Sequence, residues 1–310
     1  MRLCRFGEGR LGLVEGGYQA GEVTQIRDVT AALDALPAYR YPLPEYDVMI
    51  ANLDRVAARI REITPWAGVV PLEGLKLLSP VANPGKIVAA PVNYQKHLDE
   101  AKADVQIHSN NPAHTLTIHK AGLFLKATSS LVGAGEGIAL RHLARRNDHE
   151  VELAVVIGKR CNKVSKERAL EYVAGYSIGL DISIRGSEDR SFRKSADSYT
   201  VLGPWMVTAA EIPDPGALDL WIKVNGATKQ SSNTKYLILG VPELIEMASA
   251  YYTLFPGDVI ITGTPEGVGP IEPGDTLLAY VEKIGEMTVK VGAAPGFENA
   301  ERPIGAPAQA

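Results

Sequence analysis

Three acidic residues in the middle of the chain, Glu150, Glu152 and Asp181, have the type and spacing of cation ligands. Glu150 and Glu152 lie two residues apart in DHEVELAVVIG, and alternate side chains of a β-strand point to the same face. Asp181 ends a second apolar run and adds a third carboxylate. Oxygen ligands without Cys or His suit Mg²⁺, with Mn²⁺ or Ca²⁺ as alternatives, better than Zn²⁺. By itself, however, this pattern favours an ordinary strand with two solvated acids.

A second candidate for chemistry is the pair His97 and Glu100 in NYQKHLDE. They are three positions apart, so in a helix they would share one face. A carboxylate beside an imidazole fixes its tautomer and strengthens it as a general base for water. Surface His–Glu pairs are common on helices, so the spacing alone favours an exposed pair without a catalytic role.

Three further polar residues stand at the ends of apolar runs or in glycine-rich sequence. Lys126 closes GLFLK and Lys194 lies in RKSADSYTVLGPW, and each alone fits a lysine that reaches solvent. Thr264 lies in TGTPEGVG, where glycines let backbone N–H groups approach an anion. That loop lacks the Gly-Lys-Ser/Thr of an ATPase phosphate loop, which excludes that class of site.

The segments that must position these residues are mostly short apolar runs, which predict strands. Strands outnumber helices without regular alternation, so the sequence predicts an α+β fold. Residues 1–80 predict a small N-terminal α/β module with a hairpin and an amphipathic helix, in which Met49, Val56 and Ile60 recur at helical spacing. Residues 81–292 form the predicted catalytic domain, and the Pro/Gly/Ala-rich residues 293–310 predict a flexible tail.

Composition excludes several classes of protein. A net charge of −4 without a basic stripe argues against a nucleic-acid partner. No run is long enough to span a bilayer, and the N-terminus lacks the apolar stretch of a signal peptide. Cys4 and Cys161, far apart in the sequence, predict reduced thiols. We therefore expect a cytoplasmic protein without a membrane partner.

Taken together, these segments resemble the fumarylacetoacetate hydrolase family from about Lys86 to about Val291. The resemblance implies that family's strand-rich mixed β-sandwich roll. It implies that the three carboxylates bind one divalent cation and that His97 and Glu100 activate water. It also implies that Lys126 stabilises developing negative charge. The remaining implied contacts to substrate are those of Tyr94, Arg185, Lys194 and Thr264.

The implied function is a metal-dependent hydrolase that cleaves a carbon–carbon bond in an acylpyruvate or related β-diketo acid through a metal-stabilised enolate. The same enolate would serve an oxaloacetate-type decarboxylase, or a keto–enol isomerase or hydratase of aromatic catabolism. A metal-binding protein without turnover is the non-enzymatic alternative, although binding alone needs no base. The resemblance also predicts a homodimer. Residues 101–123, a polar segment with three histidines, predict a lid over the site.

Overall fold

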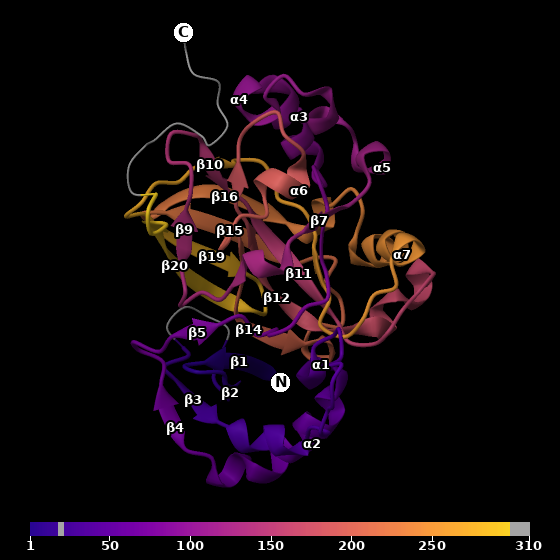
Figure 1. Cartoon of the computed structure of the whole chain (residues 1–310), viewed down its shortest axis with the longest axis vertical. Coiled ribbons are helices and arrows are strands. Elements are labelled where there is room, and N and C mark those ends of the chain that lie inside the picture. The colour runs from indigo at the N-terminus through magenta and orange to yellow at the C-terminus, as the bar shows by residue number, and fades with distance from the viewer. Residues whose placement is uncertain (18–21, 298–310) are drawn as a thin grey trace.

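The computed structural model describes residues 1–17 and 22–297, and most of the predicted flexible tail lies outside them. Two large sheets dominate the molecule (Figure 1), with short helices around them. The strand-rich α+β class predicted from the sequence is confirmed. Among the described residues, no helix is both long enough and apolar enough to cross a membrane.

The larger sheet runs through the whole molecule. Its strand order is β4 (Val69–Pro71), β3 (Gln25–Asp28), β2 (Arg10–Val14), β1 (Arg2–Phe6), β14 (Thr200–Thr208), β12 (Val173–Asp181), β11 (Val151–Ile157), β17 (Val259–Ile261), β6 (Ile87–Ala89), β7 (Phe124–Lys126). Outside this path, β5 (Leu77–Leu78) pairs with β1, and β8 (Leu131–Val132) pairs with β14.

The second sheet packs against one face of the first. Its order is β16 (Ala227–Asn233), β15 (Asp219–Val224), β19 (Thr276–Val281), β20 (Gly285–Ala293), β9 (Ile138–Leu140). A small third sheet joins β13 (Ser183–Ile184), β10 (Asn147–His149) and β18 (Gly269–Pro270). The main core lies between the two large sheets and includes Leu153 and Val155 of β11 together with Ile222 of β15.

The N-terminal residues extend the main sheet instead of forming a sheet of their own. The predicted hairpin is confirmed, because β1 pairs with β2, but β1 also pairs with β14 about two hundred residues away. The predicted amphipathic helix is also confirmed, as α1 (Val48–Ala51) and α2 (Leu53–Ile63). Met49, Val56 and Ile60 pack on the second face of the sheet, in a cluster with Ala154. The domain boundary near residue 80 stays a prediction.

Three short helices lie at the end of the molecule opposite the N-terminal module (Figure 1), and the predicted lid, residues 101–123, includes the last residues of the first helix and all of the other two. These are α3 (Gln95–Ala103), α4 (Val105–His108) and α5 (Ile118–Ala121), with a 3-10 turn at Pro112–Thr115. Two further helices flank the sheets: α6 (Arg190–Arg193) follows β13, and α7 (Val241–Tyr251) packs its apolar face into the main core. The helices α3 and α6 bring polar side chains to the end of β11.

Candidate metal centre and active site

Three carboxylates meet at the junction of β11 and β12. One oxygen from each of Glu150, Glu152 and Asp181 lies within 4.8 Å of the others, and all three side chains are buried. Strand pairing causes this meeting: the Asp181 N–H donates to the Glu150 carbonyl at 3.0 Å, and Glu152 pairs with Gly179. The cluster thus has the donor set of an oxygen-seeking divalent cation.

Two buried lysines neutralise part of this cluster. Lys194 Nζ lies 2.6 Å from Glu150 Oε2 and 2.7 Å from Asp181 Oδ2. Lys126 Nζ contacts Asp181 Oδ1 and also donates to the Tyr199 carbonyl at 2.8 Å. Neither lysine is the solvated residue that its sequence alone would suggest, since both are at most 5% exposed.

Arg185 connects the cluster to a fourth buried acid. Its Nη2 donates to Glu150 Oε1 at 3.0 Å and its Nε donates to Asp148 Oδ2 at 2.7 Å. Burial alone would raise the pKa of Glu150, but Lys194 and Arg185 together hold it below its usual value. Sequence reasoning missed Asp148, which is fully buried.

Glu152 differs from its two neighbours. In the part of the chain that the structure describes, no lysine or arginine forms an ion pair with it. It accepts the Gly263 N–H at 2.5 Å. Burial, and then the charges of Asp181 and Glu150, raise the pKa of Glu152 well above its usual value. A bound divalent cation would supply the missing positive charge, so these residues fit the metal that the sequence predicted.

His97 and Glu100 form a hydrogen-bonded pair on α3. His97 Nδ1 lies 2.8 Å from Glu100 Oε2, and Glu100 Oε1 accepts the Gly267 N–H at 2.9 Å. Because a carboxylate only accepts, Nδ1 carries the proton and Nε2 stays available as a base. His97 is 4% exposed and lines a cavity together with Glu150 and Glu152. The pair is therefore not an exposed helix pair, and it faces the carboxylates.

The loop after β17 supplies Thr264 to the same cavity. Its hydroxyl donates to the Val151 carbonyl at 3.0 Å and accepts from Gln230 Nε2 at 2.7 Å. Only glycine fits at position 267, because its φ is +93° and a Cβ there would lie 2.1 Å from the Lys229 carbonyl oxygen. Gln230 could not be selected from the sequence, because it is a single buried residue in a mostly exposed strand.

Four of the sequence-predicted residues do not line the cavity: Tyr94, Glu100, Lys126 and Asp181. Tyr94 is 1% exposed, and within the described residues its hydroxyl has no hydrogen-bond partner. The Lys126 ammonium is bonded to Asp181 and to the Tyr199 carbonyl. The predicted substrate contacts of Tyr94 and Lys126 stay predictions, whereas Arg185, Lys194 and Thr264 do line the cavity.

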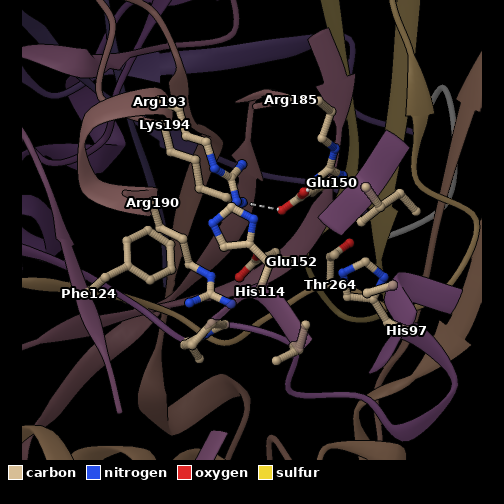
Figure 2. A pocket seen from close by; sticks show the side chains of 15 residues that line it. His97, His114, Phe124, Glu150, Glu152, Arg185, Arg190, Arg193, Lys194 and Thr264 are labelled. Atoms are coloured by element: carbon tan, nitrogen blue, oxygen red, sulfur yellow. Dashed lines mark hydrogen bonds and ion pairs between the residues drawn. The ribbon is translucent and has the colours of Figure 1, made fainter. Parts of the chain in front are cut away.

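The predicted lid covers this cavity. Ala101, Ile107 and His114 contribute to its wall, and Arg190 and Arg193 of α6 complete it (Figure 2). The cavity volume of about 30 Å³ holds about two water molecules. The predicted lid thus forms part of the cavity wall, and its closure over a substrate stays a prediction. Sequence reasoning did not select Arg190 or Arg193 for the site, and it placed His114 only within the predicted lid.

Comparison with known proteins decides the family. A sequence model described as fumarylacetoacetate (FAA) hydrolase C-terminal matches residues 86–292. The chain belongs to the fumarylacetoacetate hydrolase family. It is 58% identical over 291 residues to "Maleylpyruvate hydrolase" of Aquipseudomonas alcaligenes, covering 94% of this chain and 99% of that one. It is 40% identical to "2,4-didehydro-3-deoxy-L-rhamnonate hydrolase" of a Sphingomonas strain, covering 94% and 96%.

Solved structures of the fumarylacetoacetate hydrolase family agree. The maleylpyruvate hydrolase of Sphingobium sp. SYK-6, crystallised with manganese(II) and pyruvate, superposes with a TM-score of 0.78 at 38% identity, covering 95% of this chain and all of that one. The predicted family, its fold class and the prediction of a hydrolase that acts on carbon–carbon bonds are therefore confirmed.

Proposed function

We propose that this protein is an acylpyruvate hydrolase that releases pyruvate and a carboxylic acid, with maleylpyruvate as the first substrate to test. One observation carries the proposal: His97, which is hydrogen-bonded to Glu100, lines one cavity together with two of the clustered carboxylates, Glu150 and Glu152. A base beside a cation site is the arrangement that hydrolysis of a chelating substrate needs. The 58% identity to a maleylpyruvate hydrolase supports this choice of substrate.

Glu150, Glu152 and Asp181 are the proposed ligands of one divalent cation, with Mg²⁺ preferred and Mn²⁺ or Ca²⁺ as alternatives. When bound, the cation supplies Lewis-acid polarisation of the 2-oxo acid end of the substrate. Manganese in a structural neighbour supports the choice of a divalent metal. Lys194 and Lys126 hold the proposed ligands in place: Lys194 bonds to the Glu150 carboxylate, and Lys126 bonds to the Asp181 carboxylate.

The chain's own residues carry the hydrolytic step. Glu100 holds His97 with Nε2 free, and Nε2 takes a proton from water as the water oxygen attacks the C4 carbonyl. The C3–C4 bond then breaks, its electron pair stays with the pyruvate part, and C3 takes a proton, for which the imidazolium is a source. The products are pyruvate and the carboxylate formed from the acyl group.

The alternative reactions differ in their need for a base. Decarboxylation of a chelated 2-oxo acid needs neither a base nor an attacking water, so a base at the cavity, the buried His97 held by Glu100, favours hydrolysis over an oxaloacetate-type decarboxylase. A keto–enol isomerase or hydratase would also use a base, and the similarity to a maleylpyruvate hydrolase favours hydrolysis over these. Binding without turnover leaves the His97–Glu100 pair without a role.

Two further parts of the prediction stand as proposals. We propose a homodimer, because the N-terminal residues carry none of the candidate site residues and are available for contacts. Light scattering that shows only a monomer at micromolar concentration would refute this.

We also propose a cytoplasmic location, supported by two cysteines that are buried and unpaired.

The test is direct. Purified protein is incubated with acetylpyruvate or maleylpyruvate, with Mg²⁺ or Mn²⁺ and with excess chelator, while the enol absorbance is followed. We expect cation-dependent loss of absorbance with one pyruvate formed per substrate. Release of CO₂ without a second carboxylic acid would favour a decarboxylase, and no change with either substrate would defeat the proposal.

A further inference from the structure

Two arginines on the short helix α6 face the cavity without an acidic partner. Arg185 and Lys194 pair with carboxylates of the site, but across residues 1–17 and 22–297 no acid lies within ion-pair distance of Arg190 or Arg193. Both line the cavity, and Arg193 is only 3% exposed. Burying a cation without an anion is unfavourable, because it loses hydration and gains no compensating charge.

The hydrogen bonds of these arginines leave most of their donors unused. Arg193 Nη1 donates weakly to the Ile184 carbonyl at 3.3 Å, and among the described residues its buried Nε has no partner. Arg190 Nη2 donates to the Ala113 carbonyl of the lid at 2.8 Å. A guanidinium offers five N–H donors in a planar fork, a geometry that matches a carboxylate. The unused donors therefore fit an anionic group brought by a ligand.

His114 places the lid beside these charges. It is buried, lines the cavity, and its pKa is lowered to about 4 by burial and by Arg193 and Arg190. The neutral ring adds no further positive charge at neutral pH. Figure 2 shows Arg190 on one side of Glu152 and His97 with Thr264 on the other. The cavity thus has a cationic end toward α6 and the lid, separate from the end that holds the base.

We propose that Arg193 and Arg190 bind a second carboxylate, at the far end of the substrate's acyl chain, and so select dicarboxylate acylpyruvates over monocarboxylate ones. This inference rests on the proposed function. The proposed cation site at Glu150, Glu152 and Asp181 would take the 2-oxo acid end, so the acyl chain would be directed toward α6. Arg190 also ties the lid to α6 through Ala113, which places a substrate contact at the point where the lid closes.

Two substrates separate the role of the arginines from the hydrolytic machinery. Maleylpyruvate carries the second carboxylate and acetylpyruvate lacks it. In Arg193→Gln, we expect the ratio of the two kcat/KM values, maleylpyruvate to acetylpyruvate, to fall about 10- to 100-fold, the size of a lost charge-assisted hydrogen-bond pair. Arg193→Lys should restore part of the ratio. Arg168→Gln is the matched control, since Arg168 is exposed and pairs with Glu171 on the surface.

The two reaction products test which carboxylate the arginines hold. Maleate binding tests the part of the site that holds the acyl end of the substrate. Pyruvate binding tests the part that holds the 2-oxo acid end. Arg193→Gln and Arg190→Gln should weaken maleate binding, measured by calorimetry on the metal-loaded protein, about tenfold or more, while pyruvate binding changes less than threefold. Weaker pyruvate binding with maleate binding retained would mean that the arginines hold the 1-carboxylate, and would overturn the inference.

Other outcomes are equally decisive. Equal losses on both substrates would reduce Arg193 to a general positioning residue and overturn the inference. If Arg193→Gln fails to fold, as shown by its melting curve, the ratio of kcat/KM for maleylpyruvate to that for acetylpyruvate is measured in Arg190→Gln instead. Arg190 is only half-buried, so its replacement disturbs the fold less. If wild-type protein hydrolyses neither substrate, the proposed function fails by itself. Maleate binding by wild-type protein against Arg190→Gln then still tests the anion site, and equal binding by the two would overturn it.

Discussion

Glu100 Oε2 lies 2.8 Å from His97 Nδ1, and both side chains project from the first two turns of α3. The second oxygen of Glu100 accepts the N–H of Gly267, so the loop after β17 fixes the orientation of the carboxylate. This arrangement fixes the histidine tautomer with Nε2 as the basic atom. It connects α3 to the loop that carries Thr264.

Removal of the base should separate hydrolysis from reactions that need no attacking water. We expect His97→Ala to lower kcat for acylpyruvate hydrolysis by about 10²- to 10⁴-fold, the usual contribution of a positioned general base. Its affinity for the divalent cation, measured by calorimetry, should barely change, because His97 is not among the proposed ligands. If wild-type protein also decarboxylates oxaloacetate, His97→Ala should lower the rate of that reaction much less than the rate of hydrolysis. Equal loss of both activities would mean that His97 holds substrate or shapes the lid.

Glu100→Gln tests the orienting charge. Glutamine keeps an oxygen that can accept the Gly267 N–H, but it cannot stabilise the imidazolium that forms when His97 takes a proton. We expect a fall in kcat of about tenfold, smaller than that of His97→Ala. Steady-state kinetics with saturating acylpyruvate measures it, and a loss as large as that of His97→Ala would give Glu100 a role of its own in the chemistry.

Glu152, which has no ion-pair partner among the residues that the structure describes, predicts how cation binding and stability are coupled. In wild-type protein, a cation at about 100 times its Kd should stabilise the fold by about 2.7 kcal/mol, seen as a rise in Tm. Glu152→Gln removes one of three repelling carboxylates, so in chelator its Tm should equal or exceed that of wild-type protein.

The same Tm measurements with cation complete this test. The rise in Tm should largely disappear in Glu152→Gln, because one ligand is lost. Glu73→Gln, a change at an exposed residue outside the site, should keep the wild-type rise. Retention of the full rise in Glu152→Gln would remove Glu152 from the ligand set.

Several parts of the site could be predicted from the sequence because the signal was local. Alternation along a strand places Glu150 and Glu152 on one face, and helical spacing joins His97 to Glu100. The same alternation extends back to Asp148, so a signal for that residue existed and was overlooked. Gln230 gave no signal, because its neighbours in β16 are mostly exposed and polar.

Features that depend on distant packing could not be predicted. The pairing of β1 with β14 joins segments about two hundred residues apart, and no local pattern encodes such a register. Arg190 and Arg193 lie in a charged segment that is typical of a solvated loop. Their burial comes from the lid packing over α6, through contacts such as that of Arg190 with Ala113.

His114 predicts a dependence of stability on pH. Its pKa is lowered from 6.5 to about 4 in the folded protein, first by burial and then by Arg193 and Arg190. Between these two pH values the unfolded chain binds more protons than the folded one, so the free energy of unfolding falls as the pH is lowered from 6.5 toward 4. His114→Gln should show a shallower fall over this window.

Urea denaturation at several pH values measures this dependence. Because wild-type protein and variant share every other titrating group, the difference between their slopes isolates His114. His119→Gln, at an exposed position of α5, should keep the wild-type slope. Identical slopes for wild-type protein and His114→Gln would contradict a lowered pKa for this histidine.

The central claim is that water attacks the acyl carbonyl of an acylpyruvate within this site. Hydrolysis in water enriched in ¹⁸O, followed by mass spectrometry of the products, tests it most directly. The account predicts one ¹⁸O atom in the carboxylate newly formed from the acyl group, none in the pyruvate carboxylate, and no CO₂. Release of CO₂ in step with substrate loss, or a product that carries no ¹⁸O in its carboxylate groups, would contradict it.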